Sequence, residues 1–558
     1  MTEKFLRNAR WTDRAAFYTG VILSAGFIVL IFASLAGASY EWTYLNADKL
    51  YSPVIFRDLF TDGTGIRGWH LNAAPNFFPD MALYFLIMSI FRDVPVSDFV
   101  FSLVQYLGFL FLVFALFRQL DPQRSYRFAG LFVLLMFLFL LIPVFTERFL
   151  ITFQLLSISY HFGASIMALA SLNLLLGWWR TGNRAWLTWL GLLAALGTLS
   201  DRLYLVQFVF PVLALALLLV NPTHRKTLIP ALITTLAGAA TGWVLFNLVN
   251  NSDALHVVKT GFKMFNFDNI ANSWHTLAHH MKDLFLNHHA ERLFLVVAFA
   301  AFAGTTLYLV TRLKRLFTAQ TPGEWNRRHY ILIILALFMP AVFFAPVING
   351  AYVGPAIIRF NFIALVMGTI LLPLWLMSWP ATAKRIAPVL RFLVPVAALA
   401  LLGVFLGHAA GSQPVAGLHR YFGYYPERIR VVDSLIDTHN LRYGISDYWQ
   451  SKPLLMYSRN GARVYPVHDR DFRPSYHTTN ENWFHSGGKG RHRDPVFNFV
   501  IMDNFDQTGK LENLFKRRMD TIYHDTLEDI LVVKVPPFRF RRGNREIELL
   551  DPESLDQP

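Results

Sequence analysis

The chain contains no cysteine among its 558 residues. This excludes disulfide bonds, thiolate metal sites and cysteine nucleophiles. Charged residues are also scarce: they make up 16% of the chain, whereas soluble domains carry about 25%. Because 54% of the residues are hydrophobic and several apolar runs approach the length of a bilayer span, the composition is typical of a membrane protein.

Sequence signals for nucleic-acid binding are missing as well. The net charge is +14, yet no zinc-finger spacing and no aromatic RNA-recognition strand accompanies it. Lysines and arginines gather in short segments between apolar runs, as the positive-inside bias predicts for cytoplasmic loops. We therefore expect the excess lysines and arginines to interact with membrane lipids and not with nucleic acid.

Eleven apolar segments are predicted to cross the membrane: residues 18–38, 100–117, 128–144, 162–179, 185–199, 204–220, 228–249, 293–310, 331–347, 360–377 and 389–406. The basic loops all fall on the cytoplasmic side of the membrane only if the short run 81–91 lies on the outer surface and does not cross. The alternative is that 81–91 crosses and a later segment does not. We predict a polytopic α-helical membrane protein of about 11 transmembrane helices, with its N-terminus cytoplasmic and its C-terminus outside.

The composition changes after residue 410, where glycine, proline and charge rise and no long apolar run returns. Strand patterns occur at 462–467, 497–503 and 530–535, with helical patterns at 427–439 and 510–518. We predict two domains. Residues 1–410 form a transmembrane module with outer loops 39–80 and 250–292, and residues 411–558 form a soluble extracytoplasmic α/β domain that binds the acceptor or acts as a scaffold.

The first outer loop is too long for a simple connection between helices, and it carries several acids. Asp48 follows the first apolar run closely. An aspartate just outside a membrane can act as a general base or hold a divalent cation, although loop acids are often caps or solvated groups. Asp58 is the rival catalytic acid. His70 could orient a sugar, bind a metal or form an ordinary hydrogen bond in the loop.

Other candidate residues also fall on the predicted outer face. Arg359 lies at the outer end of a span, where its planar guanidinium could bind a phosphate or reach toward the lipid headgroups. Arg202 adjoins Asp201, so it could form a local ion pair or face a central cavity. Lys263 lies in loop 250–292, which we interpret as an amphipathic lid able to bind a phosphate and close over substrate. His161 and Tyr352 complete the candidate binding residues.

The layout resembles the GT-C superfamily of membrane glycosyltransferases, in particular its PMT/ArnT-like group. The resemblance rests on an aspartate after the first helix, on a long outer loop ending in WHLNAAPNFFPDMALYFL, on a late outer arginine in AYVGPAIIRFNF and on the C-terminal domain. It implies a donor sugar linked to polyprenyl phosphate or diphosphate, Asp48 at the catalytic acid position and Arg359 at the carrier phosphate. Ala47, Asp48 and Lys49 stand where family members often have paired acids, so a metal is left open.

This resemblance leads to a functional expectation. The protein would be a glycosyltransferase, inverting in mechanism, that moves a sugar from a polyprenyl-phosphate-linked donor to a lipid, glycan or protein acceptor at the outer face of the cytoplasmic membrane. No cofactor is required by this chemistry, although a divalent cation could take part. The alternatives are a transporter or flippase of lipid-linked saccharides, and a polysaccharide polymerase or ligase.

Overall fold

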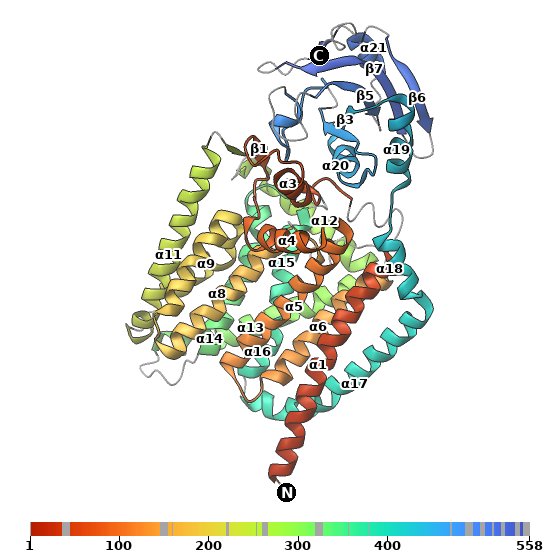
Figure 1. Ribbon diagram of the computed structural model, residues 1–558. Helices are drawn as coiled ribbons and strands as arrows, with labels where there is room; N and C mark the ends of the chain where they lie inside the picture. The colour runs from red at the N-terminus through yellow and green to blue at the C-terminus, as the bar shows by residue number, and fades with distance from the viewer. Residues whose placement is uncertain are drawn as a thin grey trace.

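The computed structural model describes most of the chain. The described residues are 2–35, 45–145, 155–158, 160–218, 222–252, 254–258, 266–318, 327–354, 357–378, 380–468, 471–485, 495–502, 508–515, 518–525, 530–541 and 547–550. Figure 1 shows a body of long helices with a smaller domain, containing a β-sheet, at the end opposite the N-terminus.

Every apolar segment expected to cross the membrane is helical wherever it is described. The helices of the body are α1 (Thr2–Ser34), α5 (Val94–Leu120), α6 (Ser125–Phe145), α8 (Phe162–Thr181), α9 (Ala185–Ser200), α10 (Phe210–Leu218) with the preceding turn η2 (Leu205–Val209), α11 (Pro222–Asn250), α13 (His289–Thr318), α14 (Arg327–Ile348), α15 (Ile358–Gly368), α16 (Leu371–Ser378) and α17 (Pro380–Ser412). The predicted helical membrane fold is thus confirmed.

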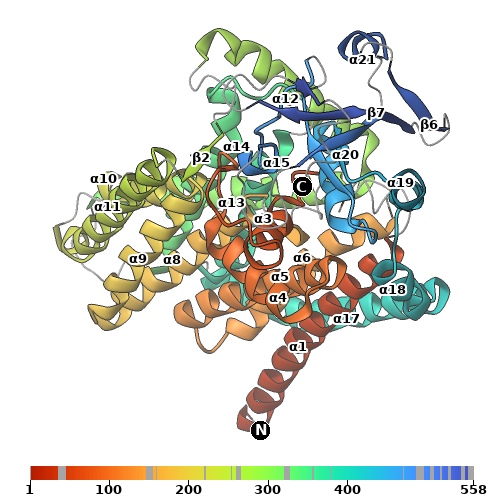
Figure 2. The ribbon, with the colours of Figure 1, turned by 45° about the horizontal axis from the view of Figure 1, so that its top comes forward.

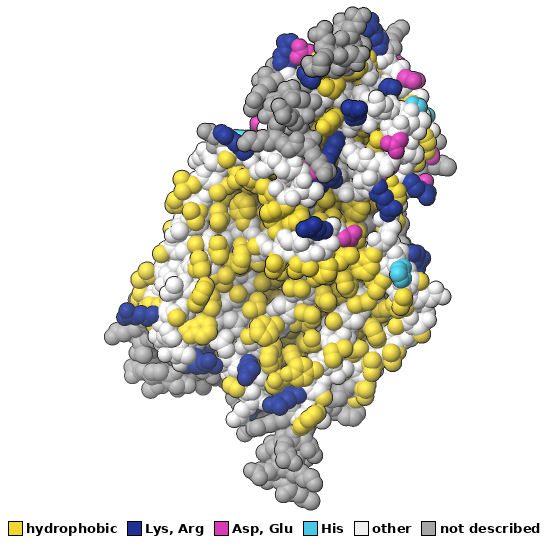
Figure 3. Space-filling model, viewed as in Figure 1, with side chains coloured by type: hydrophobic (Ala, Val, Ile, Leu, Met, Phe, Trp, Pro, Cys, Tyr) yellow, Lys and Arg dark blue, Asp and Glu magenta, His cyan; other side chains and the backbone are white. Residues whose placement is uncertain are grey.

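Six helices among the described residues are long and apolar enough to cross a membrane, or seven if one bent pair forms a single span. Shorter apolar helices include Phe77–Phe91, which contains the run expected to lie on the outer surface. The count of eleven spans therefore stays a prediction. Figure 3 shows a broad hydrophobic area on the visible face of the helical body, with lysines and arginines along its lower edge, as expected for a surface that faces lipid.

The first outer loop folds into several short elements at the end that carries the C-terminal domain (Figure 1). They are α3 (Tyr51–Phe60), β1 (Trp69–Leu71), the π-helical turn η1 (Phe77–Met81) and α4 (Ala82–Phe91). Loop 250–292 adds β2 (Leu255–Val257), the 3₁₀ turn η3 (Phe267–Asn269) and α12 (Ile270–Asn287). Strands β1 and β2 pair in parallel, so two loops far apart in sequence are joined by backbone hydrogen bonds.

The C-terminal region contains a mixed sheet, as the predicted α/β pattern requires. Its strands run in the order β4-β3-β5-β7-β6, with β8 also paired to β7. The elements are α18 (Pro414–Phe422), α19 (Glu427–His439), β3 (Tyr443–Ser446), α20 (Tyr448–Tyr457), β4 (Arg463–Pro466), the turn η5 (Glu481–Trp483), β5 (Phe497–Met502), α21 (Thr508–Leu514), β6 (Asp520–Asp525), β7 (Ile530–Phe540) and β8 (Ile547–Leu549).

The C-terminal domain packs directly on the first outer loop, with α20 against α3; Figure 2 shows this end of the molecule turned toward the viewer. Buried Asp62, just after α3, pairs with Arg463 of β4 at 2.7 Å and with Arg57 at 3.1 Å. The ring of Trp69 in β1 meets that of Trp483 edge-on at 5.5 Å. Paired charge and aromatic packing therefore fix the loop and the domain together.

Gly163, in the first turn of α8, permits a close approach of η1. A β-carbon at Gly163 would lie 2.6 Å from Oδ2 of Asp80, whose side chain is buried. We expect Gly163→Ala to destabilise the protein by about 1–3 kcal/mol, because the carboxyl group has no room to move. Thermal unfolding in detergent measures this effect.

The matched control is Gly108→Ala in α5, where no heavy atom lies within 4 Å of the added β-carbon. This variant should unfold at the wild-type temperature or slightly above it, because alanine favours helix. Equal unfolding temperatures for Gly163→Ala and Gly108→Ala would contradict the packing of η1 on α8.

Candidate active site

Asp48 lies in a tight turn between α1 and α3. The side chain of Asn46 accepts a hydrogen bond from the backbone N–H of Lys49 at 3.0 Å, and its carbonyl accepts from Leu50 at 3.1 Å. An asparagine that bonds its own backbone in this way favours a turn. Ala47, Lys49 and Leu50 are buried while Asp48 remains partly exposed. The turn therefore presents the Asp48 carboxylate at the outer end of the helical body.

The C-terminal domain contacts Asp48 directly. The Tyr448 hydroxyl donates a hydrogen bond to Oδ1 of Asp48 at 2.7 Å. The fully buried Lys452, one turn further along α20, donates to the carbonyl of Ala47 at 3.1 Å. Burial lowers the pKa of Lys452 to about 7, although the nearby Asp48 charge opposes this shift. Helix α20 of the C-terminal domain thus contacts both the candidate base and the residue before it.

A second buried lysine lies on the other side of this turn. Lys49 is 3.9 Å from Oδ2 of Asp98, near the start of α5, and 3.5 Å from the hydroxyl of Ser157. Burial lowers the pKa of Lys49 to about 7, with the Asp98 charge opposing the shift. Lys49, with a pKa near neutral pH, is therefore the direct neighbour of Asp48, the candidate base.

Tyr160 connects Asp48 with Arg359 electrostatically. Its hydroxyl accepts a hydrogen bond from Asn46 at 3.3 Å. Burial raises the pKa of Tyr160 to about 12, the charge of Asp48 raises it as well, and the charge of Arg359 lowers it. Both charges influence this one hydroxyl, so Asp48 and Arg359 lie in the same region of the structure as Tyr160.

Arg359 occupies the first turn of α15. Its Nε is buried and, among the residues that the structure describes, has no hydrogen-bond partner. The guanidinium lies over the ring of Phe360, with 5.2 Å from Cζ to the centroid. An unpaired, buried guanidinium nitrogen is costly unless an anion meets it. The geometry around Arg359 therefore suits a phosphate.

His161 lies beside the same helix end. Its ring is 4.7 Å from that of Phe360, and its Nδ1 lies 2.7 Å from Oδ2 of Asp201. Burial raises the pKa of Asp80 to about 7, and the charge of Asp201 contributes to this rise. His161, Asp201 and Asp80 thus form a cluster of titratable groups next to Arg359.

Two further candidates hold loops together. Arg202 donates to the carbonyl of Ala73 in the first outer loop at 3.3 Å and lies over the ring of Phe246. The Tyr352 hydroxyl is 2.7 Å from Nδ1 of His280 on α12, so the proposed lid is bound to the segment that precedes Arg359. Lys263 lies outside the described residues.

Asp58, the rival catalytic acid, has a different environment. Its side chain is buried, and both carboxylate oxygens accept from the indole N–H of Trp483, at 3.1 and 2.9 Å. Asn480 donates to Oδ2 at 3.3 Å. Because both oxygens of the Asp58 carboxylate already accept hydrogen bonds, this side chain fits a structural contact between α3 and the C-terminal domain. The geometry therefore favours Asp48 over Asp58 as the base.

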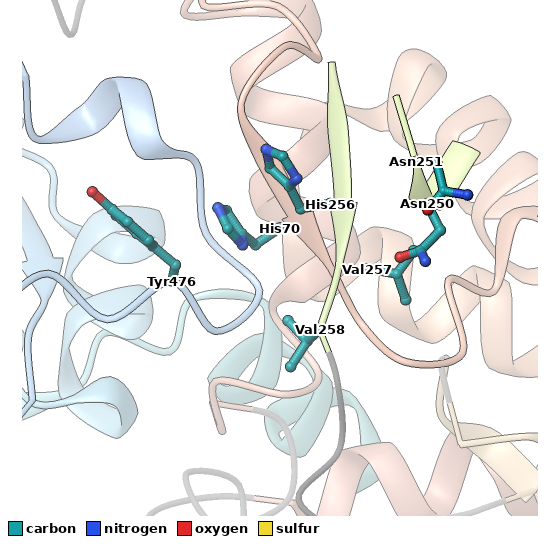
Figure 4. A pocket seen from close by; sticks show the side chains of 7 residues that line it. All are labelled: His70, Asn250, Asn251, His256, Val257, Val258 and Tyr476. Atoms are coloured by element: carbon teal, nitrogen blue, oxygen red, sulfur yellow. The ribbon is translucent and has the colours of Figure 1, made fainter. Parts of the chain in front are cut away.

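His70 belongs to a separate cluster. The register of β1 and β2 places His70 opposite His256, and Nε2 of His70 lies 2.7 Å from Oε1 of Glu481. The ligand atoms of these three residues lie within 4.8 Å of one another. Figure 4 shows His70 between His256 and Tyr476, beside a cavity of about 420 Å³. This cluster is the candidate metal site of the described chain.

Sequence reasoning missed Tyr448, Lys452, His256 and Glu481. The only sequence signal for Tyr448 and Lys452 was the mixture of aromatic and polar residues in the segment YGISDYWQSKPL. The pairing of β1 with β2 brings together residues 186 positions apart, since His70 faces His256, and neither three-residue strand has a pattern long enough to predict.

The arrangement of long apolar helices, loop elements and C-terminal sheet is shared with solved structures of another protein. In particular, the structure is similar to that of ArnT from Cupriavidus metallidurans. The likeness to its apo crystal structure has a TM-score of 0.51 at 12% identity and covers 92% of this chain and 96% of ArnT. The crystal structure of ArnT bound to undecaprenyl phosphate gives a TM-score of 0.50 at 13% identity, over 93% of this chain and 97% of that one.

No model of a known protein family and no curated protein sequence matches the chain. At the identities of the ArnT structures, the likeness concerns the fold. The expected GT-C resemblance is confirmed at that level.

Proposed function

We propose that the protein is a GT-C glycosyltransferase that moves a sugar from a polyprenyl-phosphate-linked donor to a lipid, glycan or protein acceptor. It acts at the outer face of the cytoplasmic membrane, with its N-terminus in the cytoplasm and its C-terminal domain outside. The observation that carries the proposal is that short contacts join the segments of the two charged candidates. Asp48 accepts from Tyr448 of the C-terminal domain at 2.7 Å, and Asn46 in the same turn donates to Tyr160 at 3.3 Å. The next residue, His161, has its ring 4.7 Å from that of Phe360, which follows Arg359.

In the proposed reaction, Asp48 acts on the acceptor and Arg359 acts on the leaving phosphate. Asp48 accepts the proton of the acceptor hydroxyl as that oxygen bonds to the anomeric carbon of the sugar. The bond between the anomeric carbon and the phosphate oxygen breaks, and the bonding electrons leave with polyprenyl phosphate. Arg359 stabilises the negative charge that develops on the phosphate. Attack from the face opposite the leaving phosphate inverts the anomeric centre.

The neighbouring candidates have supporting roles in this scheme. His161, bound to Asp201, and Arg202, bound to Ala73, border the phosphate region. The contact between Tyr352 and His280 holds α12 to the segment before Arg359. Lys263 of the same loop, outside the described residues, stays a candidate for phosphate binding. Asp58 holds the C-terminal domain to α3.

An apolar cavity of about 230 Å³ supports a lipid-linked donor. It lies between α12, α13 and α14, and its lining residues are Trp274, Leu277, Ala278, Met281, Phe285, Phe299, Phe343 and Phe344. A cavity without polar lining suits an isoprenoid chain better than a sugar. We propose that the first isoprene units of the carrier occupy it.

Two imidazoles and one carboxylate form a ligand set that suits Zn²⁺. His70, His256 and Glu481 would hold such a cation, which would supply positive charge and tie β1, β2 and the C-terminal domain together. Glu481 accepts from His70 at 2.7 Å, and the three segments are joined by backbone hydrogen bonds. A cation would replace the proton between these two side chains and would require the side chains, but not the backbone, to adjust.

His256→Ala and Glu481→Gln are each expected to lower the zinc content of the purified protein from about one ion per chain to near zero, because two ligands bind zinc weakly. Elemental analysis after dialysis measures this. His275→Ala, an exposed histidine of α12, is the control and should keep full metal content. Wild-type protein that binds no zinc after loading would refute the site.

The function is tested by incubating the purified protein with a panel of polyprenyl-phosphate-linked sugars and candidate acceptors, with and without chelator. The expected result is release of free polyprenyl phosphate with at least one donor. Transport of an intact lipid-linked sugar across a bilayer, without its cleavage, would support the flippase instead.

A further inference from the structure

The starting residues of α20 point at the turn that carries Asp48. The Asp447 side chain caps this helix by accepting from the backbone N–H groups of Trp449 and Gln450, at 2.6 and 3.2 Å. The cap fixes the first helical turn, and Tyr448 and Lys452, four residues apart, share one face. The Lys452 ammonium lies 4.4 Å from the centre of the Tyr448 ring.

We propose that Tyr448 and Lys452 are positioning residues for Asp48, so that the C-terminal domain completes the active site. This inference rests on the proposed function. It departs from the expectation that the domain only binds the acceptor or acts as a scaffold.

Tyr448 holds the carboxylate itself. Its hydroxyl donates to Oδ1 of Asp48 at 2.7 Å and lies 2.9 Å from the hydroxyl of Thr478. Burial raises the pKa of Tyr448 well above its usual value, and the Asp48 charge adds to the rise. The phenol therefore keeps its proton and remains a donor. With Oδ1 held in this way, the rotation of the carboxylate is fixed and Oδ2 is left for the acceptor hydroxyl.

Lys452 holds the backbone next to the base. Its ammonium donates to the carbonyl of Ala47 at 3.1 Å and to the Tyr448 hydroxyl at 3.2 Å, and it also hydrogen-bonds Thr478. Thr478 is buried and connects both residues to the loop that carries Glu481. The peptide before Asp48 and the carboxylate of Asp48 are thus both fixed by one helix of the other domain.

Pre-organisation of this kind matters for catalysis because a base must meet the proton at hydrogen-bond distance and in the correct orientation. A mere docking contact would instead affect stability alone. The two cases differ in whether kcat changes while the KM for the donor and the unfolding temperature stay the same.

Tyr448→Phe is expected to lower kcat by about tenfold or more, as for loss of one hydrogen bond to a charged group. The KM for the donor should stay within about twofold, because the proposed role of Tyr448 is to orient the base and not to bind the carrier. Tyr523→Phe, which removes a hydroxyl bonded to Asp525 in the same domain, is the matched control.

Thr478→Val serves as a second variant because it keeps the side-chain shape and removes the hydroxyl that joins Tyr448 to Lys452. It should lower kcat less than Tyr448→Phe, and it carries the test if Tyr448→Phe does not fold. If the folded variants keep the wild-type kcat while Asp48→Asn loses transfer activity, this inference is overturned and the proposed function stands. Lack of transfer by the wild type, or full activity of Asp48→Asn, would refute the proposed function itself.

Discussion

Asp48→Asn is expected to lower sugar transfer by about 10²–10⁴-fold, the usual contribution of a positioned general base. Asparagine keeps the size of the side chain and can still accept the Tyr448 hydrogen bond. It cannot take a proton from the acceptor. The loss should therefore appear in kcat, with the unfolding temperature and donor binding near those of the wild type. Initial rates of product formation and thermal unfolding in detergent measure the two quantities.

Asp58→Asn is the matched control, since it makes the same chemical change ten residues away. Its carboxylate accepts from Trp483 and Asn480 in a buried contact. Loss of charge there should cost about 1–3 kcal/mol of stability, while the folded fraction keeps much of its activity. The reverse pattern, an active Asp48→Asn and a folded but inactive Asp58→Asn, would make Asp58 the base.

Arg359→Gln is expected to lower kcat/KM by about 10²–10³-fold, as for removal of one donor that stabilises developing charge. Glutamine can still donate a hydrogen bond but carries no charge to offset that of the leaving phosphate. Arg359→Lys should recover part of the activity, because an ammonium supplies the charge without the planar pair of donors. Steady-state rates over a range of donor concentrations measure these effects.

Arg202→Gln provides the comparison for Arg359. Arg202 donates to the carbonyl of Ala73, so part of its hydrogen-bonding capacity is already used. We expect a smaller loss of kcat/KM than for Arg359→Gln. If Arg359→Gln stays within about twofold of the wild type, or loses less than Arg202→Gln, then Arg359 is not the phosphate clamp.

The helical body was predictable because each membrane helix is a long apolar run, and burial in lipid requires its backbone to bond within itself. In the C-terminal domain, α19 has the predicted bounds of residues 427–439, and three of the strands were visible as apolar β-branched runs. Strand β3 and helix α20 were missed. Strand β3, with the sequence YGIS, contains a glycine, a serine and only one β-branched residue, and the aromatic and polar residues of α20 follow no clear helical period.

The candidate site was predictable only in part. Arg359 is noticeable because a charge at a membrane edge is costly, whereas Asp48 by position alone could be an ordinary loop acid. The resemblance to GT-C enzymes singled out both. Tyr448 does not stand out, because it lies 400 positions from the carboxylate that it contacts. Glu481 similarly lies 411 positions from His70. Such contacts depend on how the C-terminal domain docks on the first outer loop, and local sequence patterns do not encode that docking.

The most direct test of the account follows a radiolabelled polyprenyl-phosphate-linked sugar in proteoliposomes that contain the wild-type protein and an acceptor. The account predicts glycosylated acceptor and free polyprenyl phosphate in equal amounts, with the anomeric centre inverted, and neither product with Asp48→Asn. Movement of the labelled lipid to the other leaflet with its sugar still attached, in wild type and Asp48→Asn alike, would contradict it.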